Sequence, residues 1–186
     1  IFVAKYDSNG NHLWAKRFGG NSNDIGMSIA ADLSDNLIIT GQVIGKVDLN
    51  GDGDWNDGGA ESSFGYGDVD IFVLKLNSNG VCQWSKRLGA KWYDRGKSVT
   101  TDSNSDIILA GTVTGYADLN GDGDSNDGVV ETTGIGPSDA VIIKFDTSGN
   151  YIWAKRIAGT LDYNEGYGVT VDSLDNIITS GVVVGD

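Results

Sequence analysis

Three tryptophans divide this chain into repeated units of nearly equal length. Trp14, Trp84 and Trp153 lie in the similar segments HLWAKRFGG, CQWSKRLGA and YIWAKRIAG, spaced 70 and then 69 residues apart. An apolar run ending in a turn signal precedes each tryptophan (IFVAKYDSNG, IFVLKLNSNG and VIIKFDTSGN). Such a period restricts the fold to architectures in which one supersecondary unit packs on its own copies.

Each unit has the pattern of four short strands. In the first unit we expect strands at about 1–7, 11–18, 26–32 and 36–44, with the same pattern about 70 residues later, because β-branched and aromatic residues dominate and apolar residues alternate there. Asn-Gly turns join the first two strands. Glycine supplies 28 of the 186 residues and proline one, which suits tight turns. The sequence therefore predicts an all-β protein with little or no helix.

Tandem four-stranded antiparallel units favour the blades of a β-propeller, in which each sheet packs on its neighbours. A β-solenoid repeats over about 20–30 residues, and stacked sandwiches need about seven strands each, so both fit less well. We expect about 2.7 blades, with units at 1–70, 71–140 and 141–186. Propellers close with about four to eight blades. We therefore expect a parent chain of several hundred residues, or other chains that cover the end sheets.

The repeated segments also resemble a known family. DIFVLKLNSNGVCQWSKRLG and the following GKSVTTDSNSDIILAGTVTG are similar to the seven-bladed beta-propeller (SBBP) repeat of bacterial surface and secreted proteins. The matching elements are D-x-F-V-x-K-x-x-x-x-G, then W-x-K, then D-x-x-x-(N/D)-(I/L)-I-x-(T/A)-G, and the resemblance covers all three copies. It implies extracellular binding or adhesion without a shared active site.

Two acidic loops, 48–61 (DLNGDGDWNDGGAE) and 118–131 (DLNGDGDSNDGVVE), separate the units. Oxygen-bearing residues occupy positions 1, 3, 5, 7, 9 and 10, and glycine at position 6 permits a sharp turn, as at the opening of an EF-hand-type calcium loop. Ca²⁺ takes about six to eight oxygen ligands, so we expect one structural Ca²⁺ in each loop. The candidate ligands are Asp48, Asn50, Asp52, Asp54, Asn56, Asp57 and Glu61, and Asp118, Asn120, Asp122, Asp124, Asn126, Asp127 and Glu131.

The loops also resemble the D-x-(D/N)-x-D-G-x-x-D (FG-GAP type) loops of integrin-type propellers, with departures. The bidentate glutamate expected at position 12 of an EF-hand is missing, and Glu61 and Glu131 follow at position 14. Asp57 and Asp127, the shifted glutamates or water are the alternatives that complete the coordination. A solvated Asp/Asn/Gly loop is the alternative to a metal site, although four carboxylates within ten residues repel one another without a cation.

Charge and residue counts limit the classes of function. The chain carries 13 basic and 26 acidic residues, and its net charge of −13 disfavours nucleic acid and anionic membranes as partners. No apolar run approaches the roughly 20 residues of a membrane helix. Cys82 and His12 are the only residues of their types, which excludes a disulfide framework and makes a hydrolase triad hard to build. We therefore predict no catalytic residues and no enzyme.

Other residues have plainer interpretations. The three repeat tryptophans are expected in the core. In each Lys-Arg pair after them, one side chain is expected to meet solvent and the other a repeat acid. Asp32, Asp102 and Asp172 are expected to form turns by hydrogen bonds to their own backbone. Trp55 and Trp92 lack a tryptophan counterpart in the other units, so we single them out as candidates for contact with a partner.

These features predict a non-catalytic, extracellular β-propeller module with structural Ca²⁺, serving adhesion, display, or protein or glycan binding on a bacterial surface. The expected partners are the remaining blades of the parent chain or other protein chains, and a surface protein or glycan. One alternative is part of a calcium-dependent propeller hydrolase or lactonase whose active site lies in other blades. Another is a purely architectural subunit of a filament or array.

Overall fold

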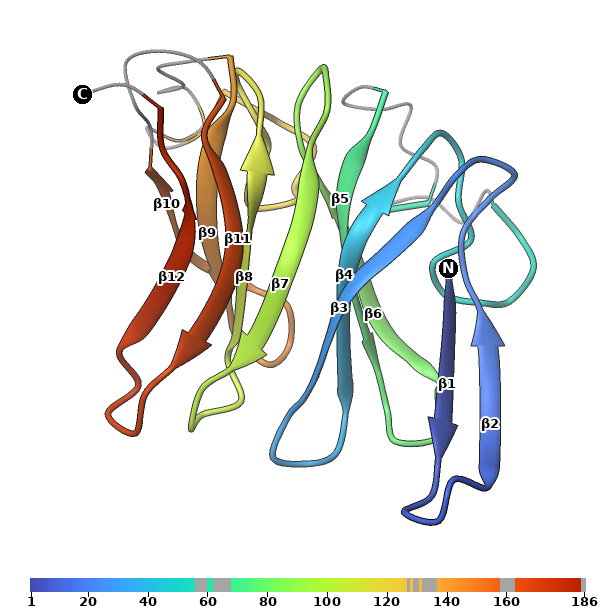
Figure 1. Cartoon of the computed structure of the whole chain (residues 1–186). Coiled ribbons are helices and arrows are strands. Elements are labelled where there is room, and N and C mark those ends of the chain that lie inside the picture. Colours follow the sequence, from blue (N-terminus) through green and yellow to red (C-terminus); the bar gives the residue numbers. More distant parts are fainter. Residues whose placement is uncertain are drawn as a thin grey trace.

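The computed structural model describes residues 1–55, 60–61, 68–126, 128, 131, 137–157 and 163–184. Twelve strands lie in this described part of the chain (Figure 1). They are β1 (Phe2–Tyr6), β2 (His12–Arg17), β3 (Ile25–Ala31), β4 (Leu37–Val43), β5 (Asp70–Leu76), β6 (Cys82–Leu88), β7 (Arg95–Thr101), β8 (Ile107–Val113), β9 (Asp139–Phe145), β10 (Tyr151–Ile157), β11 (Glu165–Val171) and β12 (Ile177–Val182). The predicted four strands per unit are confirmed. None of the described helical structure is long and apolar enough to cross a membrane.

The described strands form four antiparallel sheets. Two have four strands, in the orders β3-β4-β5-β6 and β7-β8-β9-β10, and two have two strands, β1-β2 and β11-β12. The sheets stand next to one another along the chain, each turned relative to the one before it (Figure 1). The predicted all-β fold of tandem propeller blades is confirmed, with two four-stranded blades flanked by two pairs of strands.

The sheets are offset from the sequence units. The sheet β3-β4-β5-β6 takes its first two strands from the unit 1–70 and its last two from the unit 71–140. The blade boundaries that we expected at the unit boundaries therefore fall inside sheets. The physical reason is the pairing of β4 with β5 along their whole length, from Leu37 opposite Leu76 to Val43 opposite Asp70. The first acidic loop consequently joins two neighbouring strands of one sheet.

The core lies between successive sheets. One cluster joins the sheet β1-β2 to β3-β6 through Val3, Phe72 and Leu74, and a second joins β3-β6 to β7-β10 through Val73, Leu109 and Ile143. Every residue of β5 and of β8 is buried. Because both faces of these strands are covered, their sequences are largely apolar rather than alternating, and the charged Asp70 and Lys75 of β5 are each paired with an opposite charge.

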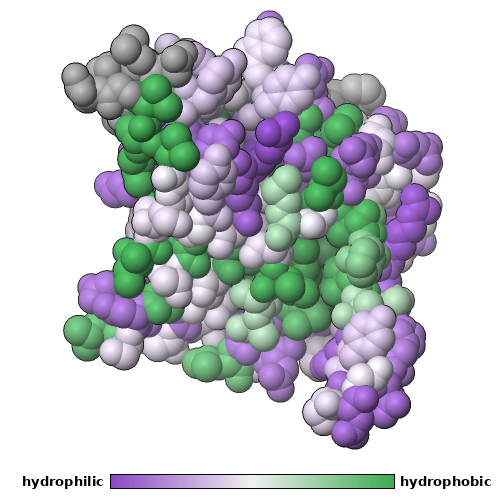
Figure 2. All heavy atoms as spheres, viewed as in Figure 1, coloured by the Kyte–Doolittle hydropathy of each residue, from purple (hydrophilic) through white to green (hydrophobic). Residues whose placement is uncertain are grey.

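The first strands of successive sheets also make direct contact. The amide of Val99 on β7 donates a hydrogen bond to Ser28 Oγ on β3 (3.1 Å), and the amide of Val169 on β11 donates to Ser98 Oγ on β7 (3.2 Å). The same contact therefore links the sheet β3-β6 to β7-β10 and the sheet β7-β10 to β11-β12. Apolar side chains reach the surface on β3, where Ile29 is 55% exposed, and hydrophobic patches lie between hydrophilic areas on the face seen in Figure 2.

Candidate functional site

The first acidic loop begins on a buried, hydrogen-bonded aspartate. Asp48 Oδ2 accepts a hydrogen bond from the amide of Gly53 (2.9 Å), and Oδ1 accepts one from the amide of Gly51. Both glycines have positive φ, 82° and 93°, which other residues adopt only with strain. The sharp turn predicted at position 6 is therefore present. The second loop repeats it, with Asp118 Oδ2 accepting from the Gly123 amide at 2.8 Å.

The backbone of each loop is also fixed to the neighbouring sheet. The amide of Gly19, just after β2, donates to the carbonyl oxygen of Asp48 (2.7 Å), and Gly89, just after β6, donates in the same way to Asp118 (3.0 Å). The next residues, Leu49 and Leu119, are fully buried in the core. Each loop therefore touches two sheets: the one whose strands it joins and the preceding one.

Side chains at positions 3, 5 and 7 follow the loop surface. In the first loop the Asp52 amide donates to Asn50 Oδ1 and the Asp54 amide donates to Asp52 Oδ1, both at 2.8 Å. In the second loop the Asp122 and Asp124 amides make the corresponding bonds to Asn120 and Asp122, and the Asn126 amide donates to Asp124 Oδ1 at 2.9 Å. These local bonds set the alternate spacing of the oxygen-bearing side chains.

The glutamate at position 14 turns back to the start of its loop. Glu61 is buried, and its Oε1 accepts hydrogen bonds from the amides of Leu49 (2.9 Å) and Asn50 (2.7 Å). Glu131 is buried in the same way and accepts from the Leu119 amide at 3.0 Å. In both copies, two buried carboxylates thus belong to the base of the loop, one at position 1 and one at position 14.

The described residues alone do not assemble a metal centre. Among them, no three His, Cys, Asp or Glu side chains are arranged to hold an ion. Three of the predicted ligands, Asn56, Asp57 and Asp127, lie outside the described residues. The donor types suit a hard cation. In this structure the oxygens of Asn50, Asp52, Asn120 and Asp122 accept hydrogen bonds from backbone amides or from asparagine side chains of their own loop. Calcium in these loops stays a prediction.

Burial and two acidic residues of the first loop raise the pKa of the single cysteine. Cys82 is half-buried on β6, and burial, together with the negative charges of Glu61 and Asp48, raises the pKa of its thiol to about 11. With a calcium chelator present, we expect alkylation of Cys82 to be slow at pH 8 and to keep accelerating beyond pH 9, because only the thiolate reacts. The urea-unfolded chain is the control, and its alkylation rate should level off above about pH 10, one pH unit lower than needed to half-ionise the folded thiol, because its pKa is near the ordinary value of 9.0. Identical folded and unfolded profiles would contradict this prediction.

The repeat tryptophans lie half-buried between sheets. Trp14 Nε1 donates to the carbonyl oxygen of Ser78, and Trp84 Nε1 donates to that of Thr147, both at 3.3 Å. Each acceptor lies in the β-hairpin turn of the following sheet. A Cβ atom at Gly80 would come within 3.1 Å of the Trp14 ring, so glycine is required beneath it. Trp14 and Trp84 therefore join sheets and pack against the core clusters, but they are half-buried rather than inside the core as expected.

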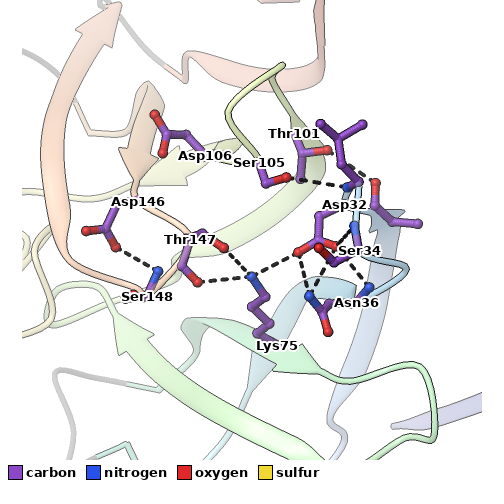
Figure 3. A network of polar contacts seen from close by, with 12 residues as sticks. Asp32, Ser34, Asn36, Lys75, Thr101, Ser105, Asp106, Asp146, Thr147 and Ser148 are labelled. Carbon is purple, nitrogen blue, oxygen red and sulfur yellow. Dashed lines mark hydrogen bonds and ion pairs between the residues drawn. The ribbon is translucent and has the colours of Figure 1, made fainter.

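A lysine inside the apolar strand joins three segments (Figure 3). Lys75 Nζ lies 3.0 Å from Asp32 Oδ2 and also donates to the carbonyl oxygen of Thr147 at 3.0 Å. Asp32 Oδ1 accepts from the amides of Ser34 and Asn36, as expected for a turn residue. Burial alone would raise the pKa of Asp32, but hydrogen bonds from Asn36 and Lys75 outweigh it and lower the pKa. Sequence reasoning missed this lysine, although it recurs as Lys5 and Lys144.

The arginine of the Lys-Arg pair meets a repeat acid, as predicted. Arg87 Nε and Nη2 lie 2.7 and 2.6 Å from Asp70 Oδ2, and both side chains are buried. Arg87 Nη1 donates to the carbonyl oxygen of Gly45 at 2.6 Å. Arg156 and Asp139 form the same pair in the next sheet, 3.0 Å apart.

The two tryptophans singled out as partner contacts lie in different surroundings. Trp55 belongs to the first acidic loop and is 37% exposed. Trp92, in the β6–β7 connection, is 56% exposed and lines a pocket of about 550 Å³. The pocket includes further aromatic and charged residues that the sequence did not point to. Neither tryptophan's role as a contact is tested by this geometry.

Comparison with known proteins supports the architecture. No family model matches the chain. Over 119 residues it is 29% identical to the uncharacterized WD repeat-containing protein L264 of Acanthamoeba polyphaga mimivirus, a match that covers 57% of the chain and 8% of that protein. Over 150 residues it is 28% identical to the regulatory protein FlaEY of Caulobacter vibrioides, covering 81% of the chain and 14% of that protein. The chain thus spans a small part of the length of both relatives.

The sheet topology and the similarity to a WD repeat-containing protein together define the chain as a β-propeller-like repeat module. These similarities do not test the SBBP resemblance, the extracellular location or the bound metal.

Proposed function

We propose that this chain is part of a non-catalytic, extracellular β-propeller that serves adhesion, display, or protein or glycan binding at a bacterial surface. We propose further that each acidic loop holds one structural Ca²⁺. The observation that carries the calcium proposal is the pair of buried carboxylates at the base of both loops, Asp48 with Glu61 and Asp118 with Glu131.

Electrostatics supports a cation at these positions. A buried carboxylate is costly unless its charge is compensated, and amide hydrogen bonds offset only part of that cost. The side chains of Asn50, Asp52 and Asp54 add oxygen donors of the kind that Ca²⁺ prefers. When bound, Ca²⁺ would supply positive charge and tie these donors together. Because each loop also bonds to the preceding sheet, the ion would stiffen a contact between sheets.

A binding role is favoured over catalysis by the repetition itself. The two acidic loops have the same local geometry, so they behave as a property of the repeat rather than as one specialised centre. The lone histidine, His12, is an exposed residue on β2, with its ring edge-on to Tyr6 at 5.7 Å. The pocket beside Trp92 instead includes residues that differ between units, such as Trp92 and Arg95, which suits selective recognition.

Calorimetry with and without calcium tests the metal proposal. We expect millimolar Ca²⁺ to raise the melting temperature relative to a chelator, with about 1–2 kcal/mol of stabilisation per site if the dissociation constant is about 0.1–1 mM. Asp52→Ala and Asp122→Ala should each abolish uptake of one ion. Asp7→Asn removes one charge outside the loops and is the matched control. Unchanged melting in calcium, or unchanged uptake in both loop variants, would identify the loops as ordinary acidic turns.

A further inference from the structure

The pocket beside Trp92 lies where two sheets meet. It is lined by residues of the β6–β7, β8–β9 and β10–β11 connections and of the ends of β7, β8 and β11, and it measures about 550 Å³. This volume falls within the range of about 300–1,000 Å³ that is typical of small-molecule sites. Its lining includes a cation (Arg95), a carboxylate (Glu165), hydroxyl groups (among them Thr112) and aromatic rings (Trp92, Tyr93 and Tyr163).

Two polar groups at the pocket lack a hydrogen-bond partner. Arg95 on β7 and Thr112 on β8 are cross-strand partners, so their side chains lie next to each other. Arg95 Nε and Thr112 Oγ1 are both buried, and neither has a hydrogen-bond partner in the part of the chain that the structure describes. A buried donor without an acceptor is unfavourable, more so when it is charged. An anion in the pocket would compensate the charge of Arg95.

Two cations, Lys97 and Arg95, share the carboxylate of Glu165. Lys97 Nζ lies 2.6 Å from Oε2, and the hydrogen bond from Lys97, together with the more distant charge of Arg95, lowers the pKa of Glu165. Lys97 also lies over the ring of Tyr167, 4.2 Å from its centroid. Within the described residues no carboxylate forms an ion pair with Arg95, whose nearest aromatic contact is the Tyr93 ring at 5.8 Å. A guanidinium of this kind matches a carboxylate through its planar fork of donors.

The aromatic rings of the pocket favour a ligand with a flat, partly apolar face. Trp92, Tyr93 and Tyr163 are all more than half exposed, and they offer flat apolar faces at the pocket. The hydroxyl of Thr112 and the carboxylate of Glu165 can bond hydroxyl groups. Arg95 is also specific to this unit, since its counterparts are Ile25 and Glu165.

We infer that this pocket binds an acidic sugar, a single hexuronate residue whose carboxylate meets Arg95 and whose ring lies against the aromatic side chains. The net charge of −13 repels a long polyanion more strongly than a ligand with one carboxylate. The inference deepens the proposed binding function by naming a ligand class and its site. It does not depend on calcium in the acidic loops.

Titration calorimetry with sodium glucuronate, in the presence of a chelator, tests the inference. Glucuronate should bind, and glucose or acetate alone should bind at least about tenfold more weakly, since each lacks one half of the recognised chemistry. Arg95→Gln should weaken glucuronate binding by at least about tenfold. Trp92→Ala, at a side chain that is 56% exposed, should weaken it as well, whereas Trp55→Ala should bind like the wild type.

Several results would overturn the inference. These are absence of glucuronate binding, equal binding of glucuronate and acetate, or wild-type affinity in both Arg95→Gln and Trp92→Ala. The calcium proposal fails separately. If Asp52→Ala and Asp122→Ala change neither melting nor calcium uptake but glucuronate still binds, the loops are ordinary turns and the pocket assignment stands.

Discussion

Replacing Arg87 with methionine is expected to destabilise the chain by about 3–5 kcal/mol, the cost of breaking a buried ion pair by removing one partner. Methionine keeps most of the volume of the side chain, so the loss is chiefly electrostatic. Asp70 would keep its carboxylate in the core without the guanidinium at 2.6 Å. Burial raises the pKa of Asp70 even with Arg87 present. The charge of Arg87 and its hydrogen bond to Asp70 lower the pKa, but they do not cancel the effect of burial. Chemical denaturation at pH 7 measures the change.

Two further variants sharpen this test. Arg17→Met is the matched control, because Arg17 occupies the same repeat position but is exposed, and we expect a loss below about 1 kcal/mol there. The double variant Arg87→Met with Asp70→Leu removes both charges and should recover much of the stability. If Arg87→Met costs no more than Arg17→Met, the buried pair does not stabilise the sheet as argued.

The second large effect concerns the pH dependence of stability through Asp94. Asp94 is fully buried, its Oδ1 accepts hydrogen bonds from the amide (2.7 Å) and hydroxyl (3.1 Å) of Thr114, and its Oδ2 accepts one from the Ala90 amide. Burial raises its pKa from 3.8 to about 7, and these bonds oppose burial only in part. Between pH 3.8 and about pH 7, the Asp94 carboxyl group is therefore protonated in the folded chain and ionised in the unfolded chain.

The free energy of unfolding is expected to fall as the pH rises and Asp94 loses its proton. The stabilising contribution of Asp94 is complete below about pH 4 and is lost as the pH rises through 7. Its slope in between approaches about 1.4 kcal/mol per pH unit. Asp94→Asn should remove this slope. At pH 5 we expect the variant to be about 1–3 kcal/mol less stable than the wild type, since an amide offers one acceptor fewer, and the gap should narrow or reverse by pH 8.

The chain provides a natural precedent for this variant. Asn164 stands at the same repeat position, is equally buried, and accepts a hydrogen bond from the Val184 amide at 2.9 Å. An amide therefore fits this environment. Urea unfolding at pH 5, 6, 7 and 8 gives the comparison. Parallel stability curves for the wild type and Asp94→Asn across that range would contradict a raised pKa for Asp94.

Local patterns were sufficient to predict the strands. Alternation and turn signals locate β1–β4 within one or two residues of their observed bounds, because these signals act over a few residues. The offset between sheets and units was not predictable in this way. It depends on the pairing of β4 with β5, which are separated by the first acidic loop, and nothing local in either strand identifies that partner.

The candidate site was predicted only in part. The positions of the glycines and aspartates in the loops follow from spacing, and the turns at Gly53 and Gly123 have the expected positive φ. The return of Glu61 to the Leu49 amide crosses 12 residues, so spacing alone left its role open. The pocket brings together residues from connections about 70 positions apart, and Trp92 was its only member with a signal in the sequence.

The offset of the sheets bears on how such a chain can grow. Since each four-stranded sheet is shared between two consecutive units, inserting or deleting one whole unit breaks a sheet at its centre and rebuilds it with an equivalent half. The new neighbours would make the same contacts, such as the Trp84 bond to the next hairpin turn. Duplication of one unit therefore changes the number of blades without requiring any new kind of interface.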